Sequence, residues 1–284
     1  VYQNAKGETR LTIAERKRIL TTHIYGVDID RQAVETTKLS LLLKALEGEN
    51  DASLSQQMPL FHERALPNLS DNIKCGNSLI ASDFSMASED LVRVRAFDWP
   101  AQFPDAMKAG GFDAIIGNPP YIRIQGFPSD QVAYFVNHYR AATGNYDIYV
   151  NFIERGLNLL SGVGHLGMIL PNKCFRTDYG HGLRSVLCER QTVEKIVDFG
   201  AEQVFEATTY TCLLFLSHNK NSTFAYATST ANENVLRDLE LEQRQGDSLT
   251  CDAWTFADQL QAKVMEKLKS KSARLMDLPA DMSR

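Results

Sequence analysis

The sequence predicts an α/β fold with a mostly parallel sheet. Short apolar runs alternate along the chain with longer stretches of helical pattern, and several runs stop at glycine, proline, asparagine or aspartate. Strands that are buried on both faces have this continuous apolar character. The runs that we expect to form strands are 24–27, 73–75, 112–116, 164–171, 193–199 and 212–216.

The first predicted elements are a helix over 12–20 and a strand that ends in acidic residues. The helix opens on Thr-Ile-Ala-Glu, which has capping-box spacing. The run 24–27 ends in Asp28, and Asp30 is placed to cap a long helix over 31–46. An acid at the carboxyl end of such a strand can accept hydrogen bonds from both ribose hydroxyls of a nucleotide, and Asp28 is our candidate.

A polar loop is expected over 49–72, because this stretch shows no periodicity. The short strand that follows enters a Gly-Asn-Ser turn that contains Asn77. The side-chain oxygen of Asn77 is an acceptor for an amino group, although an asparagine is equally well explained by the turn itself. The segment 82–111 then predicts a mixed helical insertion.

The run 112–116 is expected to be a central buried strand that delivers a rigid polar tip. Because prolines lack an N–H and hold the preceding residue extended, Asn118 and Pro119 have few conformations left. The orientation of their acceptor oxygens is therefore fixed before a substrate binds, and Tyr121 places an aromatic face beside them. These groups suit a planar substrate with an NH2 group, held between the Asn118 oxygen and the Pro119 carbonyl and stacked on Tyr121.

The later segments predict further strands and helices, with one stretch open to two interpretations. One helix is expected to follow 146–149 and end at residue 160, and another is expected over 183–190. The aromatic residues of 123–145 fit either a small helix on the core or a base-stacking platform. From 219 the chain turns polar, and an amphipathic helix is expected near 260–268.

The motif Asn118-Pro119-Pro120-Tyr121 resembles the signature of amino-group methyltransferases, above all of the DNA N6-adenine enzymes that use S-adenosylmethionine. The segments 23–30, 75–80 and 209–216 stand in the order seen in the large bacterial restriction-modification enzymes that join methylase and nuclease in one polypeptide. The chain is similar to the gamma-type, type IIG-like members of that group over most of residues 11–260.

This resemblance implies a Rossmann-like methyltransferase fold in which only the strand near 212–216 is antiparallel. It implies S-adenosylmethionine as cofactor, bound by Asp28, Ile29 and Asn77, and double-stranded DNA with a flipped adenine as partner. The four residues Asn118, Pro119, Pro120 and Tyr121 are the implied catalytic group. Tyr121 and either Phe205 or Tyr210 are the implied stacking residues, and core packing explains Phe205 equally well. Asp147 falls where the family has a recurring acid, to which we assign no role.

Composition limits the classes of protein that fit. A net charge of −5 argues against a general nucleic-acid-coating protein, although 121–190 holds seven Lys or Arg against five Asp or Glu. The five cysteines stand without close pairs and read as reduced thiols of a cytoplasmic protein. The sequence shows neither a membrane-spanning apolar run nor the spacing of metal-ligating histidines, so we expect no membrane association and no metal.

Two expectations concern the ends of the methyltransferase region. Neither Gly7 nor Gly26 belongs to a Gly-x-Gly turn, so the first cofactor motif is expected to be missing and the fold N-terminally incomplete. We therefore expect tight cofactor binding and activity to be absent from this chain alone. The predicted division is a catalytic core over 1–220 and a polar linker and helix over 221–284 that leads toward a target-recognition domain.

Two alternatives remain open at this point. The first keeps the tetrapeptide but changes the acceptor to a protein glutamine or an RNA guanine. The second is a non-catalytic scaffold or DNA-binding module that retains the sheet.

Overall fold

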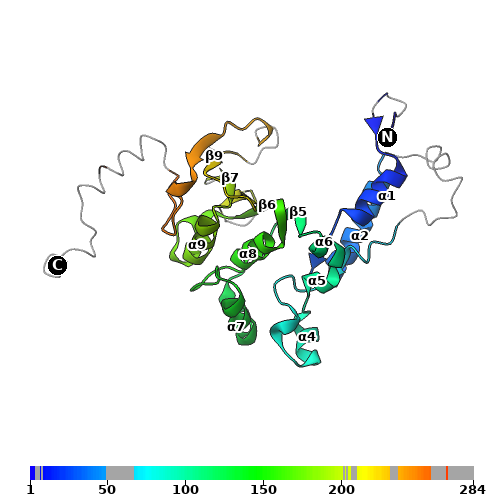
Figure 1. Cartoon of the computed structure of the whole chain (residues 1–284), viewed down its shortest axis with the longest axis horizontal. Coiled ribbons are helices and arrows are strands. Elements are labelled where there is room, and N and C mark those ends of the chain that lie inside the picture. Colours follow the sequence, from blue (N-terminus) through cyan, green and yellow to red (C-terminus); the bar gives the residue numbers. More distant parts are fainter. Residues whose placement is uncertain are drawn as a thin grey trace, which may run out of the picture. The chain divides into compact units, whose positions relative to one another are not determined.

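The computed structural model describes residues 1–3, 7, 9–48, 67–200, 202, 204–205, 210–230, 236–256 and 267. Figure 1 shows the helices and strands of the chain, coloured along the sequence. The chain forms two compact units whose segments alternate along the sequence. The first unit consists of Val1–Ile116, Arg123–Tyr139 and Asn151–Leu166. The second consists of Gly117–Ile122, Arg140–Val150 and Gly167–Arg284. The helix α8 (Tyr149–Leu159) and the strand β6 (Leu160–Pro171) each run through a boundary between the units.

The first unit contains a parallel strand pair covered by two helices. β3 (Gly26–Asp28) and β4 (Ile73–Cys75) pair in parallel, so both carboxyl ends lie at the same edge. α2 (Arg31–Leu46) follows β3, and α1 (Ile13–Thr22) precedes it. The small core of this region consists of Leu20, Val34, Leu41, Leu42, Leu69 and Ile73. The strands β1 (Tyr2–Gln3) and β2 (Thr9–Arg10) form a separate antiparallel pair.

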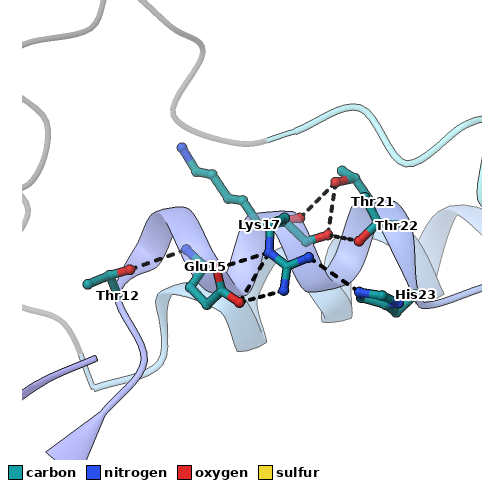
Figure 2. Close-up of polar contacts among 7 residues, drawn as sticks. Thr12, Glu15, Lys17, Thr21, Thr22 and His23 are labelled. Atoms are coloured by element: carbon teal, nitrogen blue, oxygen red, sulfur yellow. Dashed lines mark hydrogen bonds and ion pairs between the residues drawn. The ribbon is translucent and has the colours of Figure 1, made fainter.

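The predicted cap of α1 is present, as Figure 2 shows. The Thr12 hydroxyl accepts a hydrogen bond from the Glu15 N–H at 3.3 Å. Arg18 pairs with the Glu15 carboxylate at 2.6 Å. At the other end, the Thr21 and Thr22 hydroxyls donate to backbone carbonyls of the preceding turn. The Thr12 contact satisfies one of the N–H groups that have no partner within the helix at the start of α1, and the two threonine hydroxyls near its end find acceptors on the helix itself.

The mixed helical insertion predicted over 82–111 is also found, and aromatic rings hold it together. It comprises η1 (Ser82–Phe84), α4 (Ser88–Val94), α5 (Trp99–Gln102) and α6 (Pro104–Lys108). It leads into β5 (Phe112–Gly117). The ring centroids of Phe97, Trp99, Phe103 and Phe112 lie 5.2 to 6.2 Å apart in their closest pairs. The insertion is therefore packed onto the strand that carries the Asn-Pro-Pro-Tyr motif.

The aromatic stretch 123–145 forms a small helix on the core. It contains η2 (Ile124–Gly126) and α7 (Ser129–His138), with Tyr134 and Phe135 buried. The Tyr134 hydroxyl donates to the Asp83 carboxylate at 2.7 Å, which ties α7 to the insertion. These buried rings support the first of the two interpretations that the sequence left open.

The large sheet is mixed and has the strand order β10-β9-β7-β8-β6-β5, of which β10, β9, β7 and β8 belong wholly to the second unit. β8 (Thr211–Ser217) is antiparallel to β7 (Val193–Asp198), as predicted. β9 (Thr223–Thr228) is parallel to β7, and β10 (Glu242–Gln245) is antiparallel to β9. The remaining elements of this unit are η3 (Asn172–Phe175), η4 (Asp178–Gly180), α9 (His181–Arg190) and η5 (Gly246–Ser248).

The prediction of a mostly parallel sheet with one antiparallel strand is wrong, because the sheet is mixed. β8 and β10 are both antiparallel to a neighbour. Apolar runs locate strands but carry no information on their direction, and β9 and β10 lie in a stretch that we expected to be polar linker. The amphipathic helix expected near 260–268 lies outside the described residues, with the exception of residue 267.

The expectation that 112–116 is a central buried strand is wrong as well. β5 follows β6 as the last strand of the order, so one of its edges has no strand neighbour in the part of the chain that the structure describes. Asp113 and Ala114 are exposed, and Ile116 is 88% exposed. A continuous apolar run fits an end strand as well as a central one. Among the described helices, none has the length and apolar character needed to cross a membrane.

Two adjacent glycines before β5 provide a stability test. Gly110 and Gly111 both have positive φ, +102° and +118°, but only at Gly111 would a Cβ meet backbone, 2.5 Å from the Leu159 carbonyl oxygen. We expect Gly111→Ala to lower the free energy of unfolding by about 3 kcal/mol and Gly110→Ala by about 1 kcal/mol. Urea unfolding of both variants measures the difference, and equal losses would contradict the packing described here.

Candidate active site

The Asn-Pro-Pro-Tyr motif follows β5 and is anchored on β6 within the second unit. The Tyr121 hydroxyl lies 3.2 Å from the Asn118 side-chain oxygen and 3.3 Å from the Ile169 carbonyl, so its proton is shared between two acceptors. The Tyr121 ring meets the buried Tyr149 ring edge to face at 6.1 Å. Asn118 is exposed and Pro119 is buried. The acceptor of Asn118 and the aromatic face of Tyr121 are therefore held side by side.

Burial raises the pKa of Tyr121 to about 12. The hydroxyl consequently stays protonated, and remains a donor, throughout the physiological pH range. A carbonyl oxygen has two lone pairs, so the Asn118 oxygen can accept from Tyr121 and from a substrate amino group together.

Tyr210 comes to the same end of β6. Its carbonyl accepts a hydrogen bond from the Asn172 N–H at 3.0 Å. Asn172 lies three positions after Ile169, whose carbonyl contacts Tyr121. The side chain of Tyr210 is 46% exposed. Phe205 is 37% exposed, and no ring contact joins it to this group among the residues that the structure describes. Of the two residues predicted to compete for the second stacking position, Tyr210 is the one with a contact to this end of the strand.

A buried carboxylate, Asp198, supports the Tyr210 position and was not predicted. One of its oxygens accepts from the Asn172 side-chain amide and from the Gly200 N–H, both at 2.9 Å. Asp198 is 3% exposed, and its place at the end of β7 before Phe-Gly is the signal by which the sequence could have indicated it. Asn172 thus links Asp198 to the residue that precedes β8.

The residues predicted to bind the cofactor lie in the first unit, at the common edge of β3 and β4. The Gly76 N–H donates to the Asp28 carbonyl at 2.9 Å, which joins the two loops that leave these strands. Asp28 and Ile29 are exposed, and Asn77 is half-buried. A Cβ at Gly76 would lie 2.4 Å from the Phe97 ring, so the close approach requires glycine. The structure therefore brings the three predicted residues Asp28, Ile29 and Asn77 to one edge.

Two side-chain oxygens at this edge already have backbone partners. Asp28 accepts from the Asp30 N–H at 2.7 Å, and Asn77 accepts from the Leu79 N–H at 3.1 Å. Asp30 accepts from the Gln32 N–H and caps α2, as predicted. Each carboxylate or amide oxygen retains acceptor capacity, so these local bonds orient the groups without consuming them. In the described ranges, no group of three His, Cys, Asp or Glu side chains could hold a metal ion.

Comparison with known proteins gives one family match and several relatives. The family model described as "Eco57I restriction-modification methylase" matches residues 22–205. The Escherichia coli protein "Type II restriction enzyme and methyltransferase RM.Eco57I" is 33% identical over 274 residues, which cover 94% of this chain and 26% of that protein. "Type II methyltransferase M.PaeR7I" of Pseudomonas aeruginosa is 39% identical over 89 residues, which cover 31% of this chain and 16% of that protein.

Solved structures show the same fold at low identity. A nuclease-deletion mutant of the type ISP restriction-modification enzyme LlaGI, in complex with a DNA substrate mimic, matches with a TM-score of 0.56 and 14% identity. The match covers 84% of this chain and 22% of that chain. The DrdV–DNA complex matches with a TM-score of 0.55 and 14% identity, over 84% of this chain and 25% of that chain. The chain thus spans about a quarter of the length of RM.Eco57I and of these two structures.

The Asn172 contacts predict a difference in stability between two asparagines. Asn172→Ala leaves the buried Asp198 carboxylate with one donor fewer, so we expect the free energy of unfolding to fall by about 1–3 kcal/mol. Asn118 is exposed, so Asn118→Ala should change it by less than about 0.5 kcal/mol. Thermal unfolding of both variants tests this, and a larger loss from Asn118→Ala would show that the motif is mainly structural.

Proposed function

Because the chain belongs to the Eco57I restriction-modification methylase family, we propose that it is the catalytic core of a DNA adenine-N6 methyltransferase in a restriction-modification enzyme. The partner in this proposal is double-stranded DNA from which one adenine is flipped out. The observation that carries the proposal is the contact of Tyr121 with Asn118, since it keeps an amino-group acceptor beside an aromatic face. Because this chain covers only 26% of RM.Eco57I, the activity of the whole protein is part of the proposal.

The reaction at the adenine requires hydrogen-bond acceptors rather than a strongly basic side chain. The amino nitrogen of adenine is a poor nucleophile because its lone pair is delocalised into the ring. The Asn118 oxygen and the Pro119 carbonyl would accept its two hydrogens and direct the lone pair outward, while Tyr121 stacks on the ring. Transfer of the methyl group would break its bond to the sulfonium sulfur and leave the amino nitrogen positively charged. The extra proton would then pass to water, so no basic side chain has to act before the attack.

The residues at the edge of β3 and β4 fit S-adenosylmethionine, which supplies a methyl group on a positively charged sulfur when bound. The exposed Asp28 carboxylate can accept from both ribose hydroxyls. Ile29 presents an apolar side chain that is 52% exposed, and the Asn77 oxygen can accept from the adenine amino group. These residues thus offer acceptors for the ribose hydroxyls and the adenine amino group, and an apolar side chain for the adenine ring.

The roles of Asn118 and Tyr121 predict a separation of catalysis from binding. In the polypeptide encoded by the complete reading frame that contains these residues, Asn118→Ala should reduce methyl transfer to DNA at least about 100-fold, because the amino group loses an acceptor in the transition state. DNA affinity should stay within about twofold. Labelled methyl transfer and a DNA-binding assay measure the two quantities. Unchanged methylation would favour the non-catalytic scaffold.

The role of Asp28 predicts a selective effect on cofactor affinity. Asp28→Asn keeps an acceptor for the Asp30 N–H but removes the charge, so S-adenosylmethionine should bind at least about tenfold more weakly. Asp30→Asn is the matched control, because asparagine is also a good helix cap. The affinity of this variant for S-adenosylmethionine should stay within about twofold of that of the unmodified polypeptide. Calorimetric titration compares them, and equal affinities for both variants would contradict the ribose assignment.

A further inference from the structure

Arg95 ends α4 in a left-handed backbone conformation, with a φ of +54°. Among the described residues, the one other non-glycine residue with positive φ is Gln191, at the end of α9. Glycine is the common residue at such helix ends, because a Cβ disfavours this conformation. An arginine at position 95 therefore carries a conformational cost that glycine would avoid.

Arg95 contacts both loops of the proposed cofactor site. Its guanidinium Nη1 donates to the Ile29 carbonyl, in the loop that follows β3. Its own carbonyl accepts from the Asn77 N–H at 2.7 Å, in the loop that follows β4, and the next residue, Ala96, forms a parallel bridge with Asn77. One residue thus ties the candidate ribose side to the candidate adenine side.

A cavity of about 560 Å³ opens beside these contacts. Its volume lies within the range of small-molecule sites, about 300–1,000 Å³. Two apolar residues of α4 and two arginines line it, and guanidinium planes stack well on flat rings. The lining residues are Arg31, Cys75, Leu91, Val92, Arg95 and Ala96.

We propose that Arg95 is a positioning residue for cofactor binding: it sets the spacing between Ile29 and Asn77 and borders the cavity next to them. The inference rests on the proposed function and deepens it. It also gives the helical insertion a role, since Arg95 ends α4 and contacts the loops at the common edge of β3 and β4. The side-chain contact accounts for an arginine where the backbone alone would favour glycine.

The test is Arg95→Gly in the polypeptide encoded by the complete reading frame, with cofactor affinity and thermal stability measured on the same samples. Glycine relieves the backbone, so the melting temperature should stay unchanged or rise. Affinity for S-adenosylmethionine should nevertheless fall about fivefold. Affinity for 5′-methylthioadenosine should fall by the same factor, because the contact lies at the adenosine end. A purely structural role would move stability and affinity in the same direction.

Four further variants keep the result interpretable. Arg95→Lys retains a donor and should recover most of the affinity for S-adenosylmethionine. Asparagine tolerates the left-handed backbone but is too short to reach Ile29. Arg95→Asn should therefore lose the same affinity as Arg95→Gly, and it replaces that variant if the glycine variant fails to fold. Gln191→Gly relieves the same backbone conformation elsewhere, and Arg93→Ala removes a charge that pairs with Asp90 and Asp130. Both controls should bind the cofactor like the unmodified polypeptide.

The outcomes separate this inference from the function it rests on. If the unmodified polypeptide binds S-adenosylmethionine and both Arg95→Gly and Arg95→Asn bind it equally well, the role of Arg95 is wrong and the proposed function stands. If the unmodified polypeptide does not bind the cofactor, the proposed function itself fails.

Discussion

The hydroxyl group of Tyr121 is the contact on which the proposed base site depends, because it joins the Asn-Pro-Pro-Tyr motif to the neighbouring strand. It reaches the Asn118 oxygen and the Ile169 carbonyl at 3.2 and 3.3 Å. Two prolines restrict the backbone in between, so the acceptors can vary little in position. Tyr210 is held at the same strand end through Asn172, which in turn is held by the buried Asp198. The proposed stacking and accepting groups are therefore held at one end of β6.

The cofactor side depends on a different constraint, the parallel pairing of β3 and β4. Parallel strands place their carboxyl ends together, so Asp28 and the Gly76-Asn77 turn meet although more than forty positions separate them. Gly76 permits the close approach to Phe97, and Arg95 bridges the two loops. Local side-chain-to-backbone bonds orient Asp28 and Asn77 without exhausting their oxygens. A preorganised acceptor set of this kind lowers the ordering cost of binding.

The sequence was sufficient to predict features set by local pattern. The strand runs, the Thr12 and Asp30 caps and the helical insertion are all found near their predicted positions. Strand direction was not predictable, because an apolar run reads the same in both directions, and the end position of β5 has no local signal. Arg95 was missed because Ile29, which its side chain contacts, lies 66 positions away, and the contact of Asp198 with Asn172 spans 26 positions. Such contacts appear only once the strands are paired.

The most direct test of the central claim is to identify the methylated product. The polypeptide encoded by the complete reading frame would be incubated with labelled S-adenosylmethionine and a mixture of DNA, RNA and protein, and the products digested and separated by mass. We expect N6-methyladenine in the DNA to be the labelled product. Label on a protein glutamine or an RNA guanine, or no transfer at all, would contradict it.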